Sequence, residues 1–421
     1  MTVVRGSSAA TWARRGLLAV VLLGAAVIPG RASSQTNPHC TGLRCDTPGS
    51  ILWTRGLAGR WVAQDGVAGT VPATGGAYVA STGRLAVLGY GDTVIGFEAD
   101  TGRRAWKAVL PGLAPRAEIV SLRAWPTEVA AGVEVPTAGG GESWYEVVFS
   151  AATGAHIRTY PAPEFGGAVW ADQESTVIVG SNSVTRFANL TGKVIWTRST
   201  GGAAQDWMVA GGYLYVAETS GSDLSSRQVT ALHRFDMLTG AQRSIRPVES
   251  AFDGTPEGVV GGVVLFSNTD GLSAYSAQNG ELRWQQPSIV LELVDQVRRT
   301  LYVSNGNALT SLNAQTGEAA GRPARALSTS LYAVKAGVAL GLDQGQGALG
   351  KAWGYSMQSR KVVWTSAALP WPHYFVDLTG LGGSLSPTGA ITLLTTCAAE
   401  GAPRGNNAAP CLQPELAALK F

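Results

Sequence analysis

The stretch that decides the fold runs from Ile95 to Trp106 and reads IGFEADTGRRAW. An alternating run reaches an aromatic residue, a turn closes on Gly102, and tryptophan stands four residues further on. Glycine supplies a left-handed backbone at little cost, so this order predicts a strand, a tight turn and a second strand. The same phrase returns along the chain, and this repetition organises the whole sequence.

Six further copies follow the first, and their spacing indicates a propeller. Copies recur at an average of about 43 residues, which suits one four-stranded blade per repeat. The last copy has Arg360 where the others have glycine, and the copies at 154, 240 and 317 lack the tryptophan. The turn glycines are Gly102, Gly154, Gly192, Gly240, Gly280 and Gly317, and the tryptophans are Trp106, Trp196, Trp284 and Trp364.

The two ends of the chain together form one more copy. Residues 46–49, followed by Trp53, match the second half of the phrase, and residues 416–421 match the first half. Pairing between the two ends would remove exposed sheet edges. We therefore predict an all-β fold, an eight-bladed β-propeller of four-stranded antiparallel blades, closed by a strand near Ile51–Arg55 that pairs with the C-terminal strand.

These phrases resemble the tryptophan-docking repeat of the pyrroloquinoline-quinone-like β-propeller family, and the resemblance covers nearly all of residues 44–421. The family contains quinone-dependent dehydrogenases and non-enzymatic propellers, including a scaffold for outer-membrane protein assembly. The resemblance implies that blades whose copies lack tryptophan are docked less tightly. It also implies a blade-docking role for Trp53, Trp106, Trp196, Trp284 and Trp364 and for Gly102, Gly154, Gly192, Gly240, Gly280 and Gly317.

The first 34 residues differ from the rest and predict export. Arginines precede an apolar run over residues 16–28, and Ala32–Ser34 supply small residues for a peptidase. This layout is typical of a secretory signal peptide, with a retained membrane anchor as the alternative. The run is short for a bilayer span, which takes about 20 residues. We predict a signal peptide over 1–34, an N-terminal segment over 35–49 and the propeller over 50–421.

Charge argues against nucleic acid as a partner. The full chain carries a net charge of +3, and the predicted signal peptide contains four arginines and no acidic residue. The mature chain would therefore have no basic excess with which to neutralise phosphates. We expect a monomer with no membrane span after cleavage, located in the secreted, periplasmic or cell-wall-associated fraction.

The four cysteines predict disulfides. Outside the cytoplasm an even count favours bridges, and the spacings match no common zinc pattern. A bridge between Cys397 and Cys411 would close a loop in the split blade, and Cys40 with Cys45 would form the other local pair. Cross-pairing between the N-terminal and C-terminal cysteines is the alternative. Sequence separation favours the local pairing.

The sequence does not favour an enzyme. Quinone-dependent dehydrogenases of this family carry an adjacent cysteine pair and a calcium site with glutamate and asparagine, and the chain has no Cys-Cys. Asp172 and Asp206 are candidate axial acids, interpreted as solvated loop acids. We predict no catalytic residue, no metal and no cofactor; pyrroloquinoline quinone with calcium belongs to the enzyme alternative. The histidines are scattered, at His39, His156, His233 and His373.

Four long loops should join second to third strands and so lie on one face of the propeller. They span residues 136–142, 219–227, 343–351 and 397–414. Recognition usually resides in variable loops on a rigid scaffold, so this face predicts the binding surface for an envelope or extracellular protein, although the loops could equally be insertions without function. The leading interpretation is a protein-binding scaffold or sensor. A quinone-dependent oxidoreductase of alcohols or sugars and a carbohydrate- or cell-wall-binding propeller are the alternatives.

Overall fold

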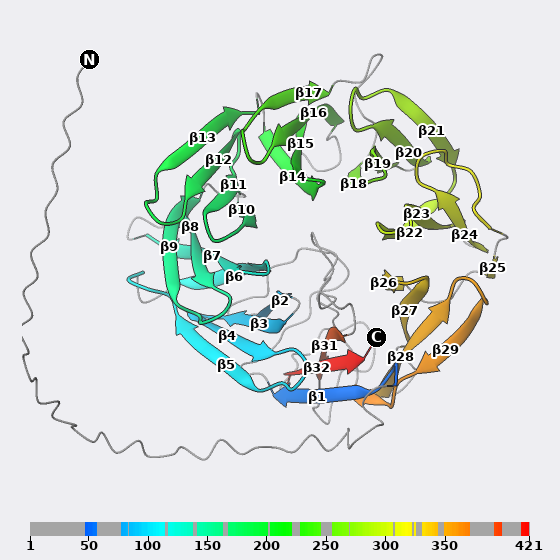
Figure 1. The fold of residues 1–421 in the computed structure, drawn as a ribbon, viewed down its shortest axis with the longest axis horizontal. Coiled ribbons are helices and arrows are strands. Elements are labelled where there is room, and N and C mark those ends of the chain that lie inside the picture. Colours follow the sequence, from blue (N-terminus) through cyan, green and yellow to red (C-terminus); the bar gives the residue numbers. More distant parts are fainter. Residues whose placement is uncertain are drawn as a thin grey trace, which may run out of the picture. The chain divides into compact units, whose positions relative to one another are not determined.

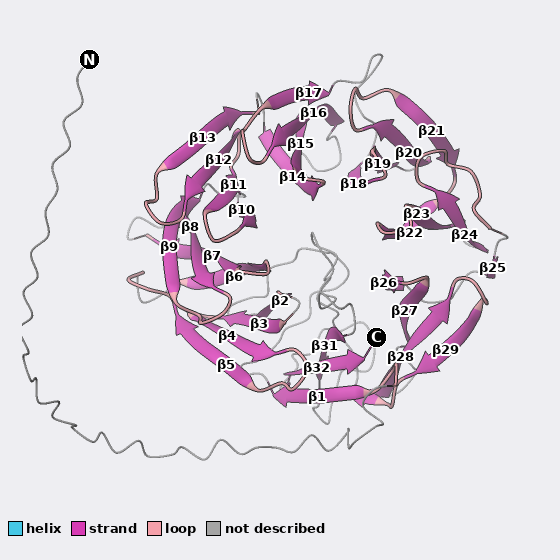
Figure 2. Ribbon diagram, viewed as in Figure 1, coloured by secondary structure: helices cyan, strands magenta, loops and turns pink. Residues whose placement is uncertain are grey.

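The chain divides into two units, Met1–Thr36 and Asn37–Phe421, and every described residue lies in the second. The described residues contain strands, turns and loops but no helix, as Figure 2 shows, and so no helix in them could cross a membrane. A computed structural model describes residues 47–56, 77–82, 84–113, 117–137, 141–162, 167–200, 203–220, 228–245, 255–268, 270–305, 308–321, 324–325, 331–343, 349–370, 391–397 and 414–420.

The described residues form eight antiparallel sheets, most of them four-stranded and built from consecutive strands. This is the all-β, repeated arrangement that the phrases predict. The first strands of successive sheets lie side by side, as β2 does with β6 and β14 with β18, and the fourth strands lie outermost (Figure 1). The strands are β1 (Ile51–Gly56), β2 (Ala77–Ser81), β3 (Leu85–Tyr90), β4 (Thr93–Glu98), β5 (Arg104–Val109), β6 (Glu118–Ala124), β7 (Glu128–Pro136), β8 (Glu142–Ser150), β9 (His156–Ala162), β10 (Gly167–Ala171), β11 (Ser175–Val179), β12 (Ser183–Ala188), β13 (Val194–Ser199), β14 (Ala203–Ala210), β15 (Tyr213–Ser220), β16 (Gln228–Asp236), β17 (Gln242–Ile245), β18 (Thr255–Val260), β19 (Val263–Asn268), β20 (Gly271–Ser276), β21 (Leu282–Pro287), β22 (Val290–Asp295), β23 (Thr300–Ser304), β24 (Ala308–Asn313), β25 (Ala324–Arg325), β26 (Leu331–Lys335), β27 (Val338–Asp343), β28 (Leu349–Ser356), β29 (Lys361–Thr365), β30 (Leu369–Pro370), β31 (Ile391–Cys397) and β32 (Pro414–Lys420).

The sheet of three described strands joins the two ends of the propeller unit. Its order is β1-β32-β31, so the first described strand pairs with the last. The pairing is antiparallel, with Thr54 opposite Ala417 and Arg55 opposite Leu416. The strand predicted near Ile51–Arg55 therefore lies beside the C-terminal strand, as the split phrase indicates.

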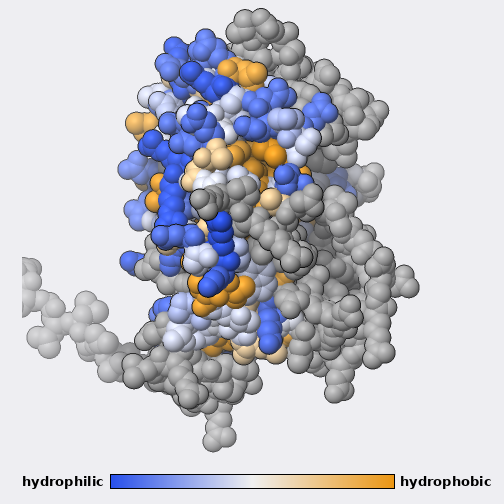
Figure 3. All heavy atoms as spheres, turned by 90° about the vertical axis from the view of Figure 1, so that its right-hand side faces the viewer, coloured by the Kyte–Doolittle hydropathy of each residue, from blue (hydrophilic) through white to orange (hydrophobic). Residues whose placement is uncertain are grey.

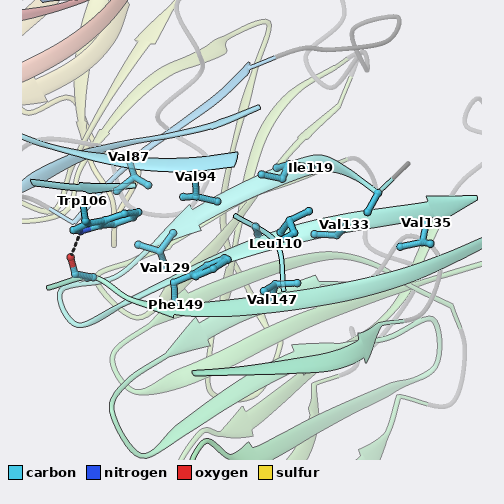
Figure 4. Packing of buried hydrophobic residues seen from close by; sticks show 13 residues of the cluster. Val87, Val94, Trp106, Leu110, Ile119, Val129, Val133, Val135, Val147 and Phe149 are labelled. Atoms are coloured by element: carbon cyan, nitrogen blue, oxygen red, sulfur yellow. Dashed lines mark hydrogen bonds between the residues drawn. The ribbon is translucent and has the colours of Figure 1, made fainter. Parts of the chain in front are cut away.

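The apolar core lies between successive sheets. Figure 4 shows the cluster between the β2–β5 and β6–β9 sheets, where Val87 and Val94 face Val129, Val147 and Phe149. Comparable clusters fill six further interfaces between successive sheets. Successive side chains of a strand point to opposite faces of its sheet, and each face packs against a neighbouring sheet. Each sheet therefore buries apolar surface against two neighbours. On the side drawn in Figure 3, hydrophilic residues cover most of the described surface and apolar residues form small separate groups.

A tryptophan on a fourth strand packs against a turn glycine of the next sheet. Gly154 has a φ of +70°, and a Cβ atom on it would lie 2.6 Å from Cε3 of Trp106. The indole N–H of Trp106 donates to the carbonyl oxygen of Ala151 at 2.8 Å, the bond drawn in Figure 4. Only glycine allows the ring to approach this closely. Burying an indole removes about 150–250 Å² from water, so this contact joins the two sheets.

The same contact recurs along the chain with the same spacing. The hydrogen-bond acceptor lies three residues before the glycine, at Ala99 for Trp53 and at Ala314 for Trp284. The side chain of Trp364 packs against Gly49, which precedes β1, and so links the β26–β29 sheet to the terminal sheet. The contacts of this kind that join one described sheet to the next are Trp53 with Gly102, Trp106 with Gly154, Trp196 with Gly240, Trp284 with Gly317 and Trp364 with Gly49.

A pair of glycine substitutions separates ring packing from backbone strain. Gly112 has a φ of +62°, close to that of Gly154, but no atom lies within 4 Å of where its Cβ would be. Both alanine variants incur the left-handed penalty of about 1–2 kcal/mol. Gly154→Ala should lose about 1–3 kcal/mol more, because it overpacks the contact with Trp106. Urea unfolding of both variants measures the difference. Equal losses in the free energy of unfolding would show that the Trp106 ring leaves room for a Cβ atom at position 154.

Candidate functional site

Arginine takes the place of tryptophan where the β6–β9 sheet meets the next one. Arg158 stands four residues after Gly154, the position that tryptophan has in other copies. Its guanidinium lies on Gly192 and donates through Nε to the carbonyl of Asn189 at 3.3 Å and through Nη2 to that of Leu190 at 2.6 Å. Asn189 lies three residues before Gly192, so this arginine uses the same acceptor position as the tryptophans.

A second arginine, Arg234, also donates to the next sheet, but from the third strand of its own sheet. The copy at Gly240 has Ser244 in the tryptophan position. Arg234, on the third strand of that sheet, stacks 4.7 Å from the centroid of the Tyr213 ring and donates to the carbonyl of Ala277 at 3.3 Å. Ala277 lies three residues before Gly280. Two of the three copies that lack tryptophan therefore have an arginine donor to the next sheet; in the third, Gly321 takes the tryptophan position.

The two candidate axial acids, Asp172 and Asp206, belong to different sheets. Asp172 follows β10, and its Oδ1 accepts hydrogen bonds from the backbone N–H groups of Glu174 and Ser175, so it caps the β10–β11 turn. The prediction that Asp206 lies in a loop is wrong. It lies within β14 opposite Ala217, next to a register shift, because the strand continues through that irregularity. The position of its side chain lies outside what the structure describes.

One histidine forms an internal polar pair that sequence reasoning missed. The ring of His233, 4% exposed, has Nε2 2.8 Å from Oε2 of Glu218. The amide of Gln242 lies 3.4 Å from Nδ1 of the same ring and also donates to the carbonyl of Ser199 in the preceding sheet. His233 is therefore a packed histidine, as its strand position indicates, with a partner that only strand pairing brings close. His39 and His373 lie outside the described residues, and exposed His156 contacts Thr159.

A buried carboxyl group lies where the first strands of three sheets meet. Glu146 is 2% exposed, and its Oε1 lies 4.0 Å from Nη1 of Arg123. Arg123 also donates to the carbonyl of Ala168 at 2.8 Å and stacks 5.5 Å from the ring centroid of Trp207. Burial raises the pKa of Glu146, while Arg123 and the backbone N–H of Ala168 act in the opposite direction. This network ties β6, β10 and β14 together.

An open pocket of about 460 Å³ lies at the end of the β6–β9 sheet next to the β7–β8 connection. Its lining includes Glu142, Trp144, Tyr145 and Pro161. The connection follows Pro136, the last residue of β7, and joins the second to the third strand. The loops at 219–227, 343–351 and 397–414 also join second to third strands, in sheets that contain β15, β27 and β31. The pocket therefore lies on the side of the sheets that the sequence predicts for binding.

The structure does not test the predicted disulfides. Cys40, Cys45 and Cys411 lie outside the described residues, and the side chain of Cys397, at the end of β31, is also outside them, so both pairings stay predictions. Within the described part of the chain, no group of three histidine, cysteine or acidic side chains could hold a metal ion.

Four-stranded antiparallel sheets in series, joined through tryptophan and turn glycine, define a fold of the repeat β-propeller type. Residues 180–328 and 228–370 match the family model described as outer membrane protein assembly factor BamB. These residues, somewhat less than half of the chain, are repeats of the pyrroloquinoline-quinone-like propeller family. The resemblance carried by the phrases is confirmed there. No curated protein matches the chain.

Several solved structures of low sequence identity resemble the chain. BamB from Moraxella catarrhalis is 17% identical, covers 73% of this chain and 97% of its own, and has a TM-score of 0.41. Sqt1 from Saccharomyces cerevisiae is 10% identical over 82% of this chain and 95% of its own, with a TM-score of 0.46. Hsv2 from Kluyveromyces lactis is 10% identical over 70% and 99%, with a TM-score of 0.43. Similarities of this size carry no conclusion about function.

Neutralising the buried carboxyl group should stabilise the protein at neutral pH. A raised folded-state pKa means that ionised Glu146 costs stability above its usual value of 4.5, and that this cost disappears as the pH falls through the raised value toward 4.5. Glu146→Gln should therefore have a larger free energy of unfolding than wild type at pH 7, and the difference should shrink toward pH 5.

Urea unfolding at the two pH values measures this, with exposed Glu174→Gln as the control that should change little. A Glu146→Gln protein less stable than wild type at pH 7 would mean that the pairing with Arg123 outweighs the cost of burial.

Proposed function

We propose that the chain is an exported, eight-bladed β-propeller that binds another protein in the cell envelope or outside the cell, as a scaffold or sensor, and that it is not an enzyme. The observation that carries the proposal is the open pocket beside the β7–β8 connection, because concave, partly aromatic surfaces next to loops on a rigid scaffold are typical binding sites. The matched family, described as an assembly factor, supports a protein partner. The layout of residues 1–34 supports export.

Contacts at both sides of the terminal sheet support a closed ring. Pairing of β1 with β32 joins the two ends of the propeller unit. Trp364 packs on Gly49 before this sheet, and Trp53 packs on Gly102 after it. Closure would give the terminal sheet a packed neighbour on each face, as the other sheets have, and would make the loops fixed points on a rigid body. A rigid body suits a scaffold, since little conformational entropy is lost when it binds.

The proposal assigns no cofactor, and the placement of the acids among the described residues supports this choice. A calcium ion needs several oxygen ligands in one place. The carboxylate of Asp172 accepts hydrogen bonds from a backbone turn, and the buried carboxyl group of Glu146 lies next to the guanidinium of Arg123. The sequence also lacks the adjacent cysteines of the family's dehydrogenases.

Site-specific photocrosslinking tests the predicted binding face. Thr137, next to the pocket, and Thr101, in a third-to-fourth-strand turn on the opposite side, are both exposed. A photoreactive residue at 137 in the mature chain should give a discrete adduct with a protein of the exported fraction, and excess unlabelled protein should suppress it. The same residue at 101 should give none. Adducts only at 101, or none at either position, would contradict the proposal.

A cofactor titration tests the enzyme alternative. Pyrroloquinoline quinone with calcium, added to the mature protein, should neither bind saturably nor support dye-linked oxidation of alcohols or sugars. Saturable binding with turnover would replace the scaffold by an oxidoreductase.

A further inference from the structure

The β6–β9 sheet extends past its neighbour at the end that carries the pocket. Strands β7 and β8 have nine residues each, whereas β11 in the next sheet has five. The pair Gly132–Glu146 is the row that meets the first residue of β10, since a Cβ on Gly167 would lie 2.7 Å from Oε1 of Glu146. The next pair toward the loop on the same face of the sheet, Glu134 with Trp144, lies beyond that contact.

Three carboxyl groups lie on the same face of this extension as Trp144. Directly paired residues of antiparallel strands lie on the same face, which places Glu118, Glu134 and Trp144 in one row across β6, β7 and β8. Glu142 precedes Trp144 by two residues, so it lies on that face as well. Trp144 is half-buried, and its pocket contains Glu142.

Glu134 experiences the negative charge of both other carboxyl groups in the free protein. Glu118 stands directly opposite Glu134, an arrangement that destabilises a sheet when both are charged. Burial, the charge of Glu142 with a hydrogen bond between the two carboxyl groups, and the charge of Glu118 all raise the pKa of Glu134. The ion pairs among described residues involve Arg103, Arg123 and His233, and none includes any of these three acids. A cation brought in from outside would relieve this repulsion.

We infer that the pocket beside the β7–β8 connection binds a cationic side chain, arginine above all, presented by the protein partner. Two features of one surface select this chemistry: an indole face, on which a guanidinium stacks, and carboxylates that can pair with it. Arginine already lies over tryptophan within the protein, at Arg123 on Trp207 and Arg186 on Trp170. The inference rests on the proposed scaffold function and names the chemistry of the partner segment.

A matched pair of peptides tests the inference. The probe is a fluorescein-labelled twelve-residue glycine-serine peptide with three arginines, and its partner has citrulline at those positions, which keeps the shape and removes the charge. Fluorescence polarisation with the mature protein should show the arginine peptide binding about tenfold more tightly. Its affinity should fall as salt is raised from 0.05 to 0.5 M, since screening at about 0.15 M already acts within about 8 Å.

Variants locate the binding. Trp144→Leu and the pair Glu134→Gln with Glu142→Gln should each weaken arginine-peptide binding about tenfold. Glu281→Gln, which removes an equally exposed acid in the β20–β21 turn, should leave it unchanged. Glu142 is exposed, so its single glutamine variant tests the site even if Trp144→Leu fails to fold. Equal affinity for the two peptides, or an equal loss in Glu281→Gln, would overturn the inference.

The crosslink at position 137 separates this inference from the scaffold proposal. An adduct that persists unchanged in the Glu134→Gln, Glu142→Gln protein would leave the scaffold standing and remove the cationic site. No adduct in any variant would contradict the scaffold itself. An adduct lost in the double variant but kept in Glu281→Gln supports both.

Discussion

The contact on which the structure depends joins the last strand of one sheet to the left-handed turn of the next. A single sheet cannot bury both of its faces, so each sheet is stable only against two neighbours. Glycine at the turn lets an indole lie on the backbone, and a carbonyl three residues earlier accepts its N–H, as Ala151 does from Trp106. One contact therefore provides apolar burial and also satisfies a polar group that burial would otherwise leave unpaired.

Arginine can take over this contact because its guanidinium can donate to the same acceptor position that the indole uses. The planar guanidinium of Arg158 lies on Gly192 much as an indole would and reaches the same carbonyl position. At Trp196 the ring packs on Gly240, but its buried indole N–H has no hydrogen-bond partner. There Arg186, from the neighbouring strand, donates to the carbonyl of Leu238 in the next sheet. The sheets thus stay connected whether tryptophan, arginine or both provide the contact.

The repeat and its strand order could be predicted because their signals are local and evenly spaced. Arg158 could also have been found, since it stands at a fixed distance from Gly154. Arg234 could not, because it reaches the joint from the third strand, and only the pairing of that strand places it there. Glu146 looks like a surface residue in the sequence, and His233 gains Glu218 only through the register of β15 and β16. The sequence predicted the four loops as second-to-third connections. It did not show which of them adjoins the pocket, because that depends on the lengths of β7 and β8, which no motif indicates.

Several departures from the repeat meet at one interface, between the β6–β9 and β10–β13 sheets, in addition to those at Ser244 and Gly321 in other sheets. There arginine replaces the docking tryptophan at 158, Glu146 is buried in the first-strand network, and Trp144 lies at the uncovered end of β8. Stability alone does not require these changes, since Trp106 and Gly154 make the ordinary contact one interface earlier. Buried and opposed charges cost free energy in the unbound protein. The β6–β9 sheet keeps these charges at the end where its strands extend past the neighbouring sheet. This is expected of a binding site in which contacts with a partner offset the free-energy cost of the charges.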